Sequence, residues 1–363
     1  MSTKISKVYS AQIVGLSGAP ISVETDVTNG LYSFTIVGLP DKSVEESRER
    51  VHAALKNSGF DSPKSRNHKL TVSLAPAEIK KEGPVFDVPI AISYLIAVGD
   101  IIGNFSDTIF VGELSLGGDL QPLRGALALA TTAKKNGFKK IILPDQNKEE
   151  ASIVSGIEVL GARNIKEVVE HLLGVKAITQ HQNSGELKNK IQYPDIGEVR
   201  GQLTAKRALQ IAAAGGHNIC MYGPPGTGKT MLAKAFTGLL PDLSEDESFE
   251  VTTIHSIAGQ TDTLLTQPPM RAPHHTSSYV SIIGGGSTPK SGEITLSHRG
   301  VLFLDELPEF ESKALESLRE PLEEGVVRIS RAKGTETFPA SFILVAAMNP
   351  CPCGYYGSKE IGR

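Results

Sequence analysis

The feature that most constrains this chain is a glycine-rich loop with the spacing G-x-x-x-x-G-K-T, formed by Gly223, Pro224, Pro225, Gly226, Thr227, Gly228, Lys229 and Thr230. The apolar residues 218–222 before the loop predict a strand, and residues 230–240 after it predict a helix. In that setting the loop N–H groups, the helix N-terminus and Lys229 bind phosphates, and the Thr230 hydroxyl ligates Mg²⁺. The loop therefore predicts a site for ATP and Mg²⁺.

Two further apolar runs, 301–304 and 342–347, predict buried parallel strands. The first leads directly into Asp305 and Glu306, and the second leads to Asn349. We expect Asp305 to hold Mg²⁺ and Glu306 to polarise the water that attacks the γ-phosphate. A lone Asn after a strand is more often a turn residue, but the order of the three motifs favours a carboxamide that orients the water or the phosphate. Glu306 and Asn349 are thus the predicted catalytic residues of an ATPase.

Composition limits the classes of partner. With 37 Lys and Arg against 40 Asp and Glu, the net charge is −3, so no global basic field recruits nucleic acid and any DNA contact must be local. The longest apolar run, around 88–98, is too short and interrupted to span a bilayer, so we expect no membrane partner. The three cysteines fit a reducing compartment, which predicts a cytoplasmic protein.

The 363 residues are enough for two domains with sizeable cores. Residues 1–173 alternate strand and helix signals, which predicts an α/β domain. The polar stretch 174–194 reads as a linker, and residues 195–363 carry the three nucleotide motifs of a second domain.

Local patterns in the first domain allow more specific predictions. The alternating residues 21–37 around Asn29 and Gly30 predict a β-hairpin. Residues 41–59 begin with a capping Asp and end with Gly, which predicts a helix. We expect Glu82 and Asp87 to be solvated surface carboxylates.

The segment 326–342 predicts two strands immediately before the strand that leads to Asn349. Arg328, Arg331 and Lys333 on it could present charge to a nucleic-acid backbone in a ring pore. The alternative is a solvated edge hairpin whose charges discourage aggregation. The sequence leaves both open.

Metal binding is not expected at His274 and His275, because adjacent residues cannot share one helical face as a zinc-binding pair does. Cys351 and Cys353 look like half of a thiolate site, and whether they bind zinc in a longer form stays open. The role of residues 255–298 is not readable.

From residue 195 to 356 the sequence resembles the AAA+ module of the magnesium-chelatase-like ATPases of the YifB/ComM family. The matching strings are GGHN at 215–218, RAPHHT at 271–276, GGG at 284–286, HRG at 298–300, LPEF at 307–310 and NPCPCG at 349–354. The resemblance implies a ring-forming, hexameric ATPase. For ComM it implies a motor that promotes branch migration of DNA during natural transformation, with single-stranded or branched DNA as partner. It also implies that Ile196 and Val199 flank the adenine.

Complete AAA+ modules continue with a further strand, an arginine finger and a helical lid, none of which is recognisable before Arg363. The resemblance therefore implies an incomplete copy: a Lon-protease-like α/β domain followed by most of a P-loop AAA+ α/β domain. We expect such a chain to bind ATP, to hydrolyse it weakly and to assemble poorly.

The first domain resembles the protease domain of Lon through KEGP at 81–84 and GEL at 112–114, followed by Gly125. A Lon-type peptidase needs a serine nucleophile and a lysine base. Val85 stands where the serine would be, and no lysine occurs between Arg124 and Ala133. We expect a fold relative without peptidase chemistry.

Two rival functions remain. A metal-chelatase motor subunit would use the same ATPase, and the Lon-like front domain argues against it. An ATP-dependent protease is disfavoured by the missing serine and lysine. The preferred DNA structure, the ring size and the pathway are not readable from the sequence.

Overall fold

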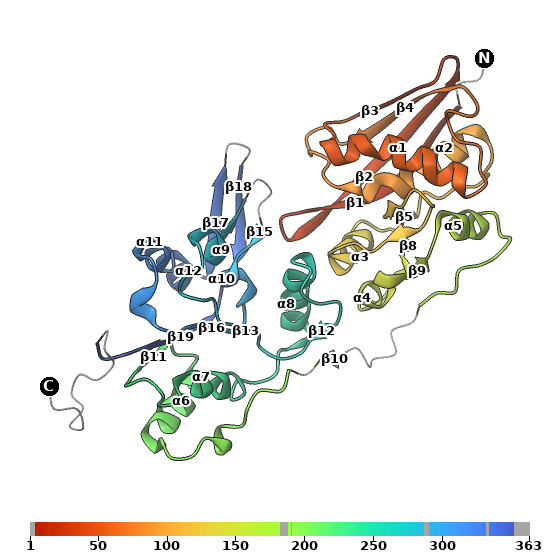
Figure 1. Ribbon diagram of the computed structural model, residues 1–363. Helices are drawn as coiled ribbons and strands as arrows, with labels where there is room; N and C mark the ends of the chain where they lie inside the picture. Colours follow the sequence, from red (N-terminus) through yellow and green to blue (C-terminus); the bar gives the residue numbers. More distant parts are fainter. Residues whose placement is uncertain (1–3, 182–187, 190, 287–289, 332–333, 352–363) are drawn as a thin grey trace. The chain divides into compact units, whose positions relative to one another are not determined.

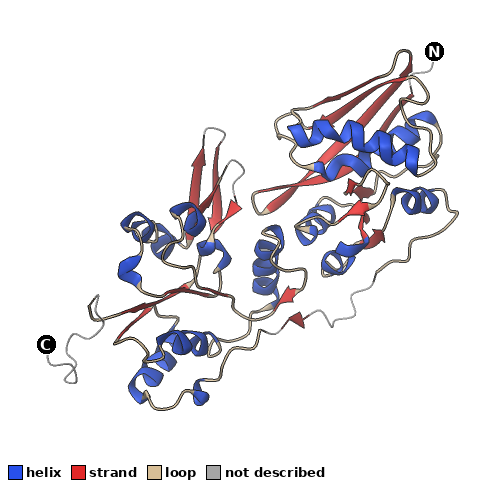
Figure 2. Cartoon of the chain, in the orientation of Figure 1, coloured by secondary structure: helices blue, strands red, loops and turns tan. Residues whose placement is uncertain are grey.

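The computed structural model describes residues 4–181, 188–189, 191–286, 290–331 and 334–351 (Figure 1). The chain forms two compact units, the first comprising Met1–Leu187 with Gly259–Asp262 and the second comprising Lys188–Ala258 with Thr263–Arg363. Both combine helices and strands, as Figure 2 shows, which confirms the predicted α/β class.

The first unit is built on a seven-stranded mixed sheet in the order β3-β4-β2-β1-β5-β8-β9. Its strands are β1 Lys4–Val14, β2 Ser17–Asn29, β3 Ser33–Val37, β4 His68–Ala75, β5 Thr108–Phe110, β8 Lys140–Pro144 and β9 Glu158–Ala162. Strands β1 and β2 form a long antiparallel hairpin, and β4 runs antiparallel to β2. The remaining neighbours pair in parallel.

The hairpin predicted around Asn29 and Gly30 is wrong. Strand β2 pairs with β1 from Val14↔Ser17 onward, and β4 lies between β2 and β3. Asn29 is opposite His68 on β4, and the Gly30 N–H donates to the carbonyl of Asn67. The turn residues therefore begin a crossover, in which the helix after β3 returns the chain so that β4 runs parallel to β3.

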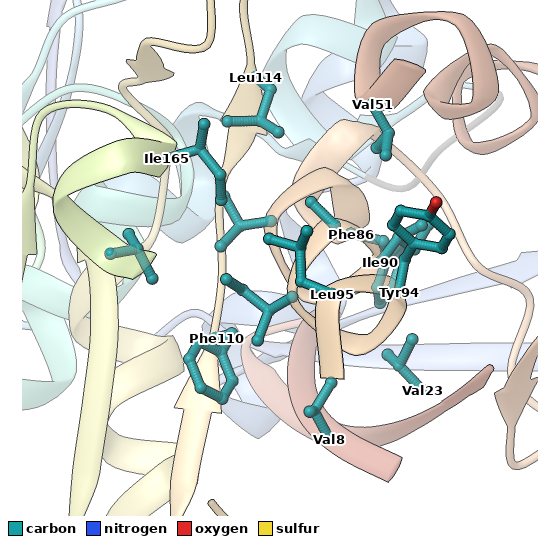
Figure 3. Close-up of a cluster of buried hydrophobic side chains, with 14 of the residues drawn as sticks. Val8, Val23, Val51, Phe86, Ile90, Tyr94, Leu95, Phe110, Leu114 and Ile165 are labelled. Carbon is teal, nitrogen blue, oxygen red and sulfur yellow. The ribbon is translucent and has the colours of Figure 1, made fainter. Parts of the chain in front are cut away.

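Helices and short elements complete the first unit: α1 Lys42–Asn57, η1 Pro84–Phe86, α2 Asp87–Val98, β6 Glu113–Leu114, β7 Leu120–Gln121, α3 Ala126–Lys135, η2 Asp145–Asn147, α4 Lys148–Ser152 and α5 Ile165–Leu172. Helix α1 begins as predicted, because the Asp41 carboxylate accepts from the Val44 N–H at 2.8 Å. Helix α2 is buried almost throughout. Phe86, Ile90 and Tyr94 on this segment join residues of the sheet in one apolar core (Figure 3).

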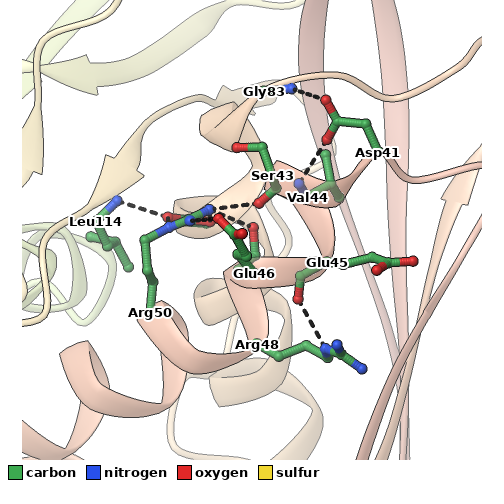
Figure 4. Close-up of polar contacts among 11 residues, drawn as sticks. Asp41, Ser43, Val44, Glu45, Glu46, Arg48, Arg50, Gly83 and Leu114 are labelled. Atoms are coloured by element: carbon green, nitrogen blue, oxygen red, sulfur yellow. Dashed lines mark hydrogen bonds and ion pairs between the residues drawn. The ribbon is translucent and has the colours of Figure 1, made fainter.

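Asp87 at the start of α2 is fully buried, which overturns its expected place on the surface. Arg50 of α1, labelled in Figure 4, donates to both carboxylate oxygens of Asp87, from Nε at 2.6 Å and from Nη2 at 3.0 Å. The Leu114 N–H also donates to Asp87 Oδ2 at 3.0 Å. A buried carboxylate is tolerated only with such partners. Glu82 does reach the surface, where it pairs with Lys80.

The second unit contains a four-stranded parallel sheet in the order β11-β19-β16-β13. Its strands are β11 Ile219–Tyr222, β19 Ile343–Met348, β16 Val301–Leu304 and β13 Met270–Arg271. The register between β16 and β13 requires glycine at position 300, where a Cβ would lie 2.0 Å from the Pro269 carbonyl oxygen. Because all four strands run in the same direction, the residues that follow them gather at one edge.

The remaining elements of the second unit are β10 Lys188–Asn189, η3 Ile196–Glu198, α6 Leu203–Gly215, α7 Lys229–Thr237, α8 Glu245–Ile257, β12 Leu264–Leu265, α9 Tyr279–Ile283, β14 Gly284–Gly285, β15 Lys290–Ser291, α10 Glu293–Leu296, η4 Leu307–Glu309, α11 Ser312–Glu316, α12 Arg319–Glu324, β17 Val326–Arg331 and β18 Gly334–Pro339. Strands β17 and β18 form an antiparallel pair. No helix among the described residues has the length and apolar character needed to cross a membrane.

Replacing Asp87 by Ala should destabilise the first unit by about 3–5 kcal/mol, because Arg50 would stay largely buried without its anion. Glu82→Ala is the matched control, because its solvent-screened pair with Lys80 should contribute little to stability. Hydrogen–deuterium exchange of α1 and α2 reports the opening free energy of this unit. Equal losses in the two variants would contradict the assigned role of the buried pair.

Candidate active site

The phosphate loop links β11 to α7 at the carboxyl edge of the second unit's sheet. Gly226 and Gly228 have φ values of +78° and +82°, a left-handed conformation that glycine adopts without strain. Helix α7 begins at Lys229, directly after the loop, so the N–H groups of its first turn point back toward the loop. A loop of this shape at the N-terminus of a helix suits an anion.

Lys229 is held inside the loop by three acceptors. Its Nζ donates to the carbonyls of Gly223 and Pro224 at 2.8 and 3.0 Å, and to Asn349 Oδ1 at 3.0 Å. An ammonium group has three N–H donors, so this set satisfies all of them. The contact with Asn349 joins the end of β19 to the loop, 120 residues earlier in the chain.

Thr230 and Asp305 meet at the same edge. The Thr230 hydroxyl and Asp305 Oδ2 are 2.8 Å apart, and both groups are exposed or half-buried. A hydroxyl and a carboxylate suit Mg²⁺, which prefers oxygen ligands and usually keeps several waters or phosphate oxygens. Among the described residues, no cluster of three or more His, Cys, Asp or Glu side chains could hold a metal ion. The Thr230 hydroxyl and the Asp305 carboxylate fit two ligand positions of a magnesium ion.

Glu306 points elsewhere than its neighbour Asp305. Its backbone is left-handed, with φ +53°, and its N–H donates to Asp305 Oδ1 at 3.0 Å. Its carboxylate Oε2 lies 3.3 Å from Nδ1 of His275, a residue that sequence reasoning did not connect with the site. The sequence carried no strand signal for this connection, because β13, which His275 follows, is only two residues long and ends at the same edge as the other motifs only through its pairing with β16.

A buried histidine fixes the strands that carry these residues. The Ser341 N–H, just before β19, donates to His298 Nδ1 at 3.0 Å, and His298 Nε2 lies 3.1 Å from Glu250 Oε2. Burial lowers the pKa of His298, although Glu250 opposes that shift. The Arg299 N–H donates to the Ser341 carbonyl at 2.6 Å. The starts of β16 and β19 are thereby tied together.

The two predicted adenine residues lie in different surroundings. Val199 is 4% exposed and belongs to the core of the second unit, whereas Ile196 is half-buried and packs against that core. Ile196 is the more accessible of the two.

The candidates for DNA contact are only partly described. Arg328 on β17 is paired with Glu320 and Glu324, each at 2.6 Å, so two anions already neutralise its charge. The backbone of Arg331 ends β17, while its side chain and Lys333 lie outside the described residues. Cys353 also lies outside them.

Two family models match separate parts of the chain. One, described as magnesium chelatase, subunit ChlI, matches residues 195–362, and the other, described as subunit ChlI of Mg-chelatase, matches residues 23–147. In the sequence, the Lon-like first domain was an argument against a chelatase motor. The match of residues 23–147 to a ChlI model removes that argument.

Curated relatives match almost the whole chain. The uncharacterized protein YifB of Escherichia coli is 44% identical over 355 residues, which cover 97% of this chain and 69% of the relative. Competence protein ComM of Haemophilus influenzae is 43% identical over 359 residues, which cover 96% of this chain and 69% of the relative. Lon protease of Koribacter versatilis is similar at a lower level, with 26% identity over 47% of this chain and 23% of its own length.

Lys229→Ala should abolish binding of a fluorescent ATP analogue, because it removes the cation proposed to bind the phosphates. The loss of stability should be small, because the ammonium group otherwise bonds mainly to carbonyls of its own loop. Lys234→Ala is the matched control, since Lys234 is exposed on the same helix. Fluorescence titration gives the affinity, and circular dichroism checks the fold. Unchanged affinity in a folded Lys229 variant would remove the loop as the phosphate site.

Proposed function

The chain belongs to the YifB/ComM family of magnesium-chelatase-like proteins, and we propose that it binds Mg-ATP and hydrolyses it. The observation that carries the proposal is a pair of contacts at one sheet edge, Lys229 with Asn349 and Thr230 with Asp305. Phosphoryl transfer depends mainly on positioning and on charge stabilisation. A phosphate loop within hydrogen-bonding distance of an acidic strand supports that chemistry.

The phosphates would be bound by residues 223–230. In this proposal Lys229 exchanges its carbonyl acceptors for phosphate oxygens, and the N–H groups of residues 226–230 bind the same oxygens. Thr230 and Asp305 would hold Mg²⁺, which neutralises charge on the β- and γ-phosphates when bound. Ile196 and Val199 would lie beside the adenine.

The reacting water would be handled by two side chains. Glu306 polarises it and accepts its proton, a task for a carboxylate and not for a backbone amide. Asn349 orients the water or the γ-phosphate through its carboxamide, after Lys229 has moved to the phosphates. Both residues follow strands of one parallel sheet, which supports their approach to a single ligand.

We further propose that hydrolysis is coupled to remodelling of DNA by a hexameric ring. The support is the similarity to ComM, whose name describes a competence protein, together with basic residues on the β17–β18 pair. Because Arg328 already forms ion pairs with two glutamates, we propose that Arg331 and Lys333 contact the DNA phosphates. Such contacts would be independent of sequence, as a motor that moves along DNA requires.

A metal-chelatase motor is the second candidate, because models of subunit ChlI match both 23–147 and 195–362. Insertion of Mg²⁺ into a porphyrin in the presence of partner subunits would support it. Peptidase activity is not proposed, because Val85 packs its side chain against the core at the position expected for a serine. Cleavage of casein that a serine-directed inhibitor stops would contradict this assignment.

Glu306→Gln should keep the affinity for Mg-ATP and lower kcat by about a hundredfold or more, because the amide preserves shape but cannot take a proton. Glu309→Gln is the matched control, since Glu309 is an exposed carboxylate three residues later. Phosphate release measures turnover, and nucleotide titration measures binding. If the Glu306 variant turns over like the control, another residue activates the water.

Replacing both Arg331 and Lys333 by Ala in the assembled protein should weaken DNA binding similarly across sequences. The slope of log affinity against log salt should fall by about one unit per lost contact. Arg328→Ala should change the slope much less, because its guanidinium is already paired. Fluorescence anisotropy with single-stranded and branched DNA over a salt series tests both. If the double variant keeps the wild-type affinity and slope, Arg331 and Lys333 do not contact DNA and lie on a solvated edge hairpin.

A further inference from the structure

Residues 193–202, the strap, are held at both ends within the second unit. At the first end, the Tyr193 hydroxyl donates to the Pro268 carbonyl at 3.0 Å. At the other end, Gln202 Nε2 donates to the Thr227 carbonyl of the phosphate loop at 3.5 Å. The two residues proposed to flank the adenine lie between these anchors. The position of the strap therefore decides where those two side chains lie.

Tyr193 is the stronger of the two anchors, because the contact of Gln202 is at the outer limit of a hydrogen bond and Gln202 is exposed. Burial raises the pKa of Tyr193 to about 12, although the backbone of Met270 opposes that shift. The phenol therefore keeps its proton at neutral pH and remains a donor. Because Pro268 lies just before β13, this bond ties the strap to the sheet.

The strap lies against helix α7, which begins at the phosphate loop. At Gly238, which caps the carboxyl end of α7, a Cβ would lie 3.1 Å from Tyr193 Cβ and 3.4 Å from the Pro194 carbonyl oxygen. Further along the strap, η3 also contacts α7. At the amino end of the helix, Gln202 reaches the loop itself. The strap thus runs from one end of α7 to the other.

A turn at Asp195 presents one apolar side chain. Asp195 Oδ1 accepts from the Gly197 N–H at 2.6 Å, and the Asp195 carbonyl accepts from the Glu198 N–H at 3.0 Å. Val199 is 4% exposed and belongs to the core, whereas Ile196 packs against that core and stays half-buried. Ile196 therefore keeps apolar surface that a ligand can cover, and it lies three residues after the first anchor.

We propose that Tyr193 is a positioning residue for the nucleotide base: by holding the strap beside β13, its hydroxyl keeps Ile196 where it packs against the adenine. The inference rests on the proposed binding of Mg-ATP. The hydroxyl donates to Pro268, so it acts on the base only through the strap. The phosphates bind to a separate segment, residues 223–230. Release of Tyr193 should therefore weaken contacts with the base and spare those with the phosphates.

The first test compares two ligands that share a phosphate chain, by isothermal titration calorimetry with Mg²⁺ present. The affinity for a non-hydrolysable ATP analogue should fall about three- to tenfold in Tyr193→Phe, because one hydrogen bond no longer holds the strap. Inorganic tripolyphosphate, which has no base, should bind the variant as it binds the wild type. Tyr279→Phe is the matched control, because it removes a hydroxyl from the same unit and keeps the ring that Lys313 contacts. Both affinities should be unchanged in the control.

Equal losses for the two ligands in Tyr193→Phe, or no loss for the ATP analogue, overturn the inference. The inference also fails if the wild type binds the analogue no more tightly than tripolyphosphate, because the base then adds nothing to affinity. Failure of the wild type to bind either ligand would instead refute the proposed function, which keeps the two failures distinct. Retained binding of tripolyphosphate shows that the variant has folded.

A double variant tests whether Tyr193 acts through Ile196. Ile196→Ala alone should lower the affinity for the ATP analogue, since it removes apolar surface beside the adenine. In that background Tyr193→Phe should have little further effect, because the side chain that it positions is already gone. The full three- to tenfold loss in that background, about the same as in the wild type, would overturn the inference.

Hydrogen–deuterium exchange follows the strap directly. Without ligand, the amides of residues 195–199 should exchange faster in Tyr193→Phe than in the wild type. In the wild type, Mg²⁺ with the ATP analogue should slow exchange of the same amides, and Mg²⁺ with tripolyphosphate should not. Unchanged exchange in the variant, or equal protection by the two ligands, overturns the inference.

Discussion

The parallel pairing of four strands in the second unit is the constraint on which the candidate site depends. Parallel strands bring their carboxyl ends to one edge, so segments separated by more than a hundred residues meet there without further folding devices. Contacts at the amino-terminal ends of the strands fix their alignment. A buried histidine, His298, binds the backbone ahead of β19, and a glycine at 300 admits the close approach of Pro269. Chemistry at the edge thus rests on packing at the opposite end of the sheet.

Much of this was predictable from local patterns. The phosphate loop, the acidic strand and the helix after Asp41 each depend on spacing within one segment, and the structure has the corresponding elements. Pairing between distant segments was not predictable in the same way. Asn29 and Gly30 carry a strong turn signal, but β4 pairs with both β2 and β3 and so separates the two strands around the turn. Asp87 was misjudged because its cation, Arg50, lies 37 residues away.

In the candidate site, too, residues could be identified from local spacing, but contacts between distant segments could not. Lys229 and Thr230 were identifiable from spacing, whereas their contacts with Asn349 and Asp305 depend on strand order. His275 was dismissed as a metal ligand and was not weighed as a partner for a carboxylate, since β13 is only two residues long and has no clear apolar run. The charge of Arg328 was visible in the sequence, but its neutralisation by α12 was not.

The internal bonds of Lys229 affect the free energy available to the proposed nucleotide. Two carbonyls and a carboxamide accept from the three N–H donors of its ammonium group, so this cation is already fully paired within the protein. A phosphate that bound here would exchange one set of hydrogen bonds for another, and only the difference between the two sets would add to its affinity. The same cation would therefore favour a doubly charged phosphate oxygen group over a weaker neutral acceptor, which makes the loop selective as well as attractive.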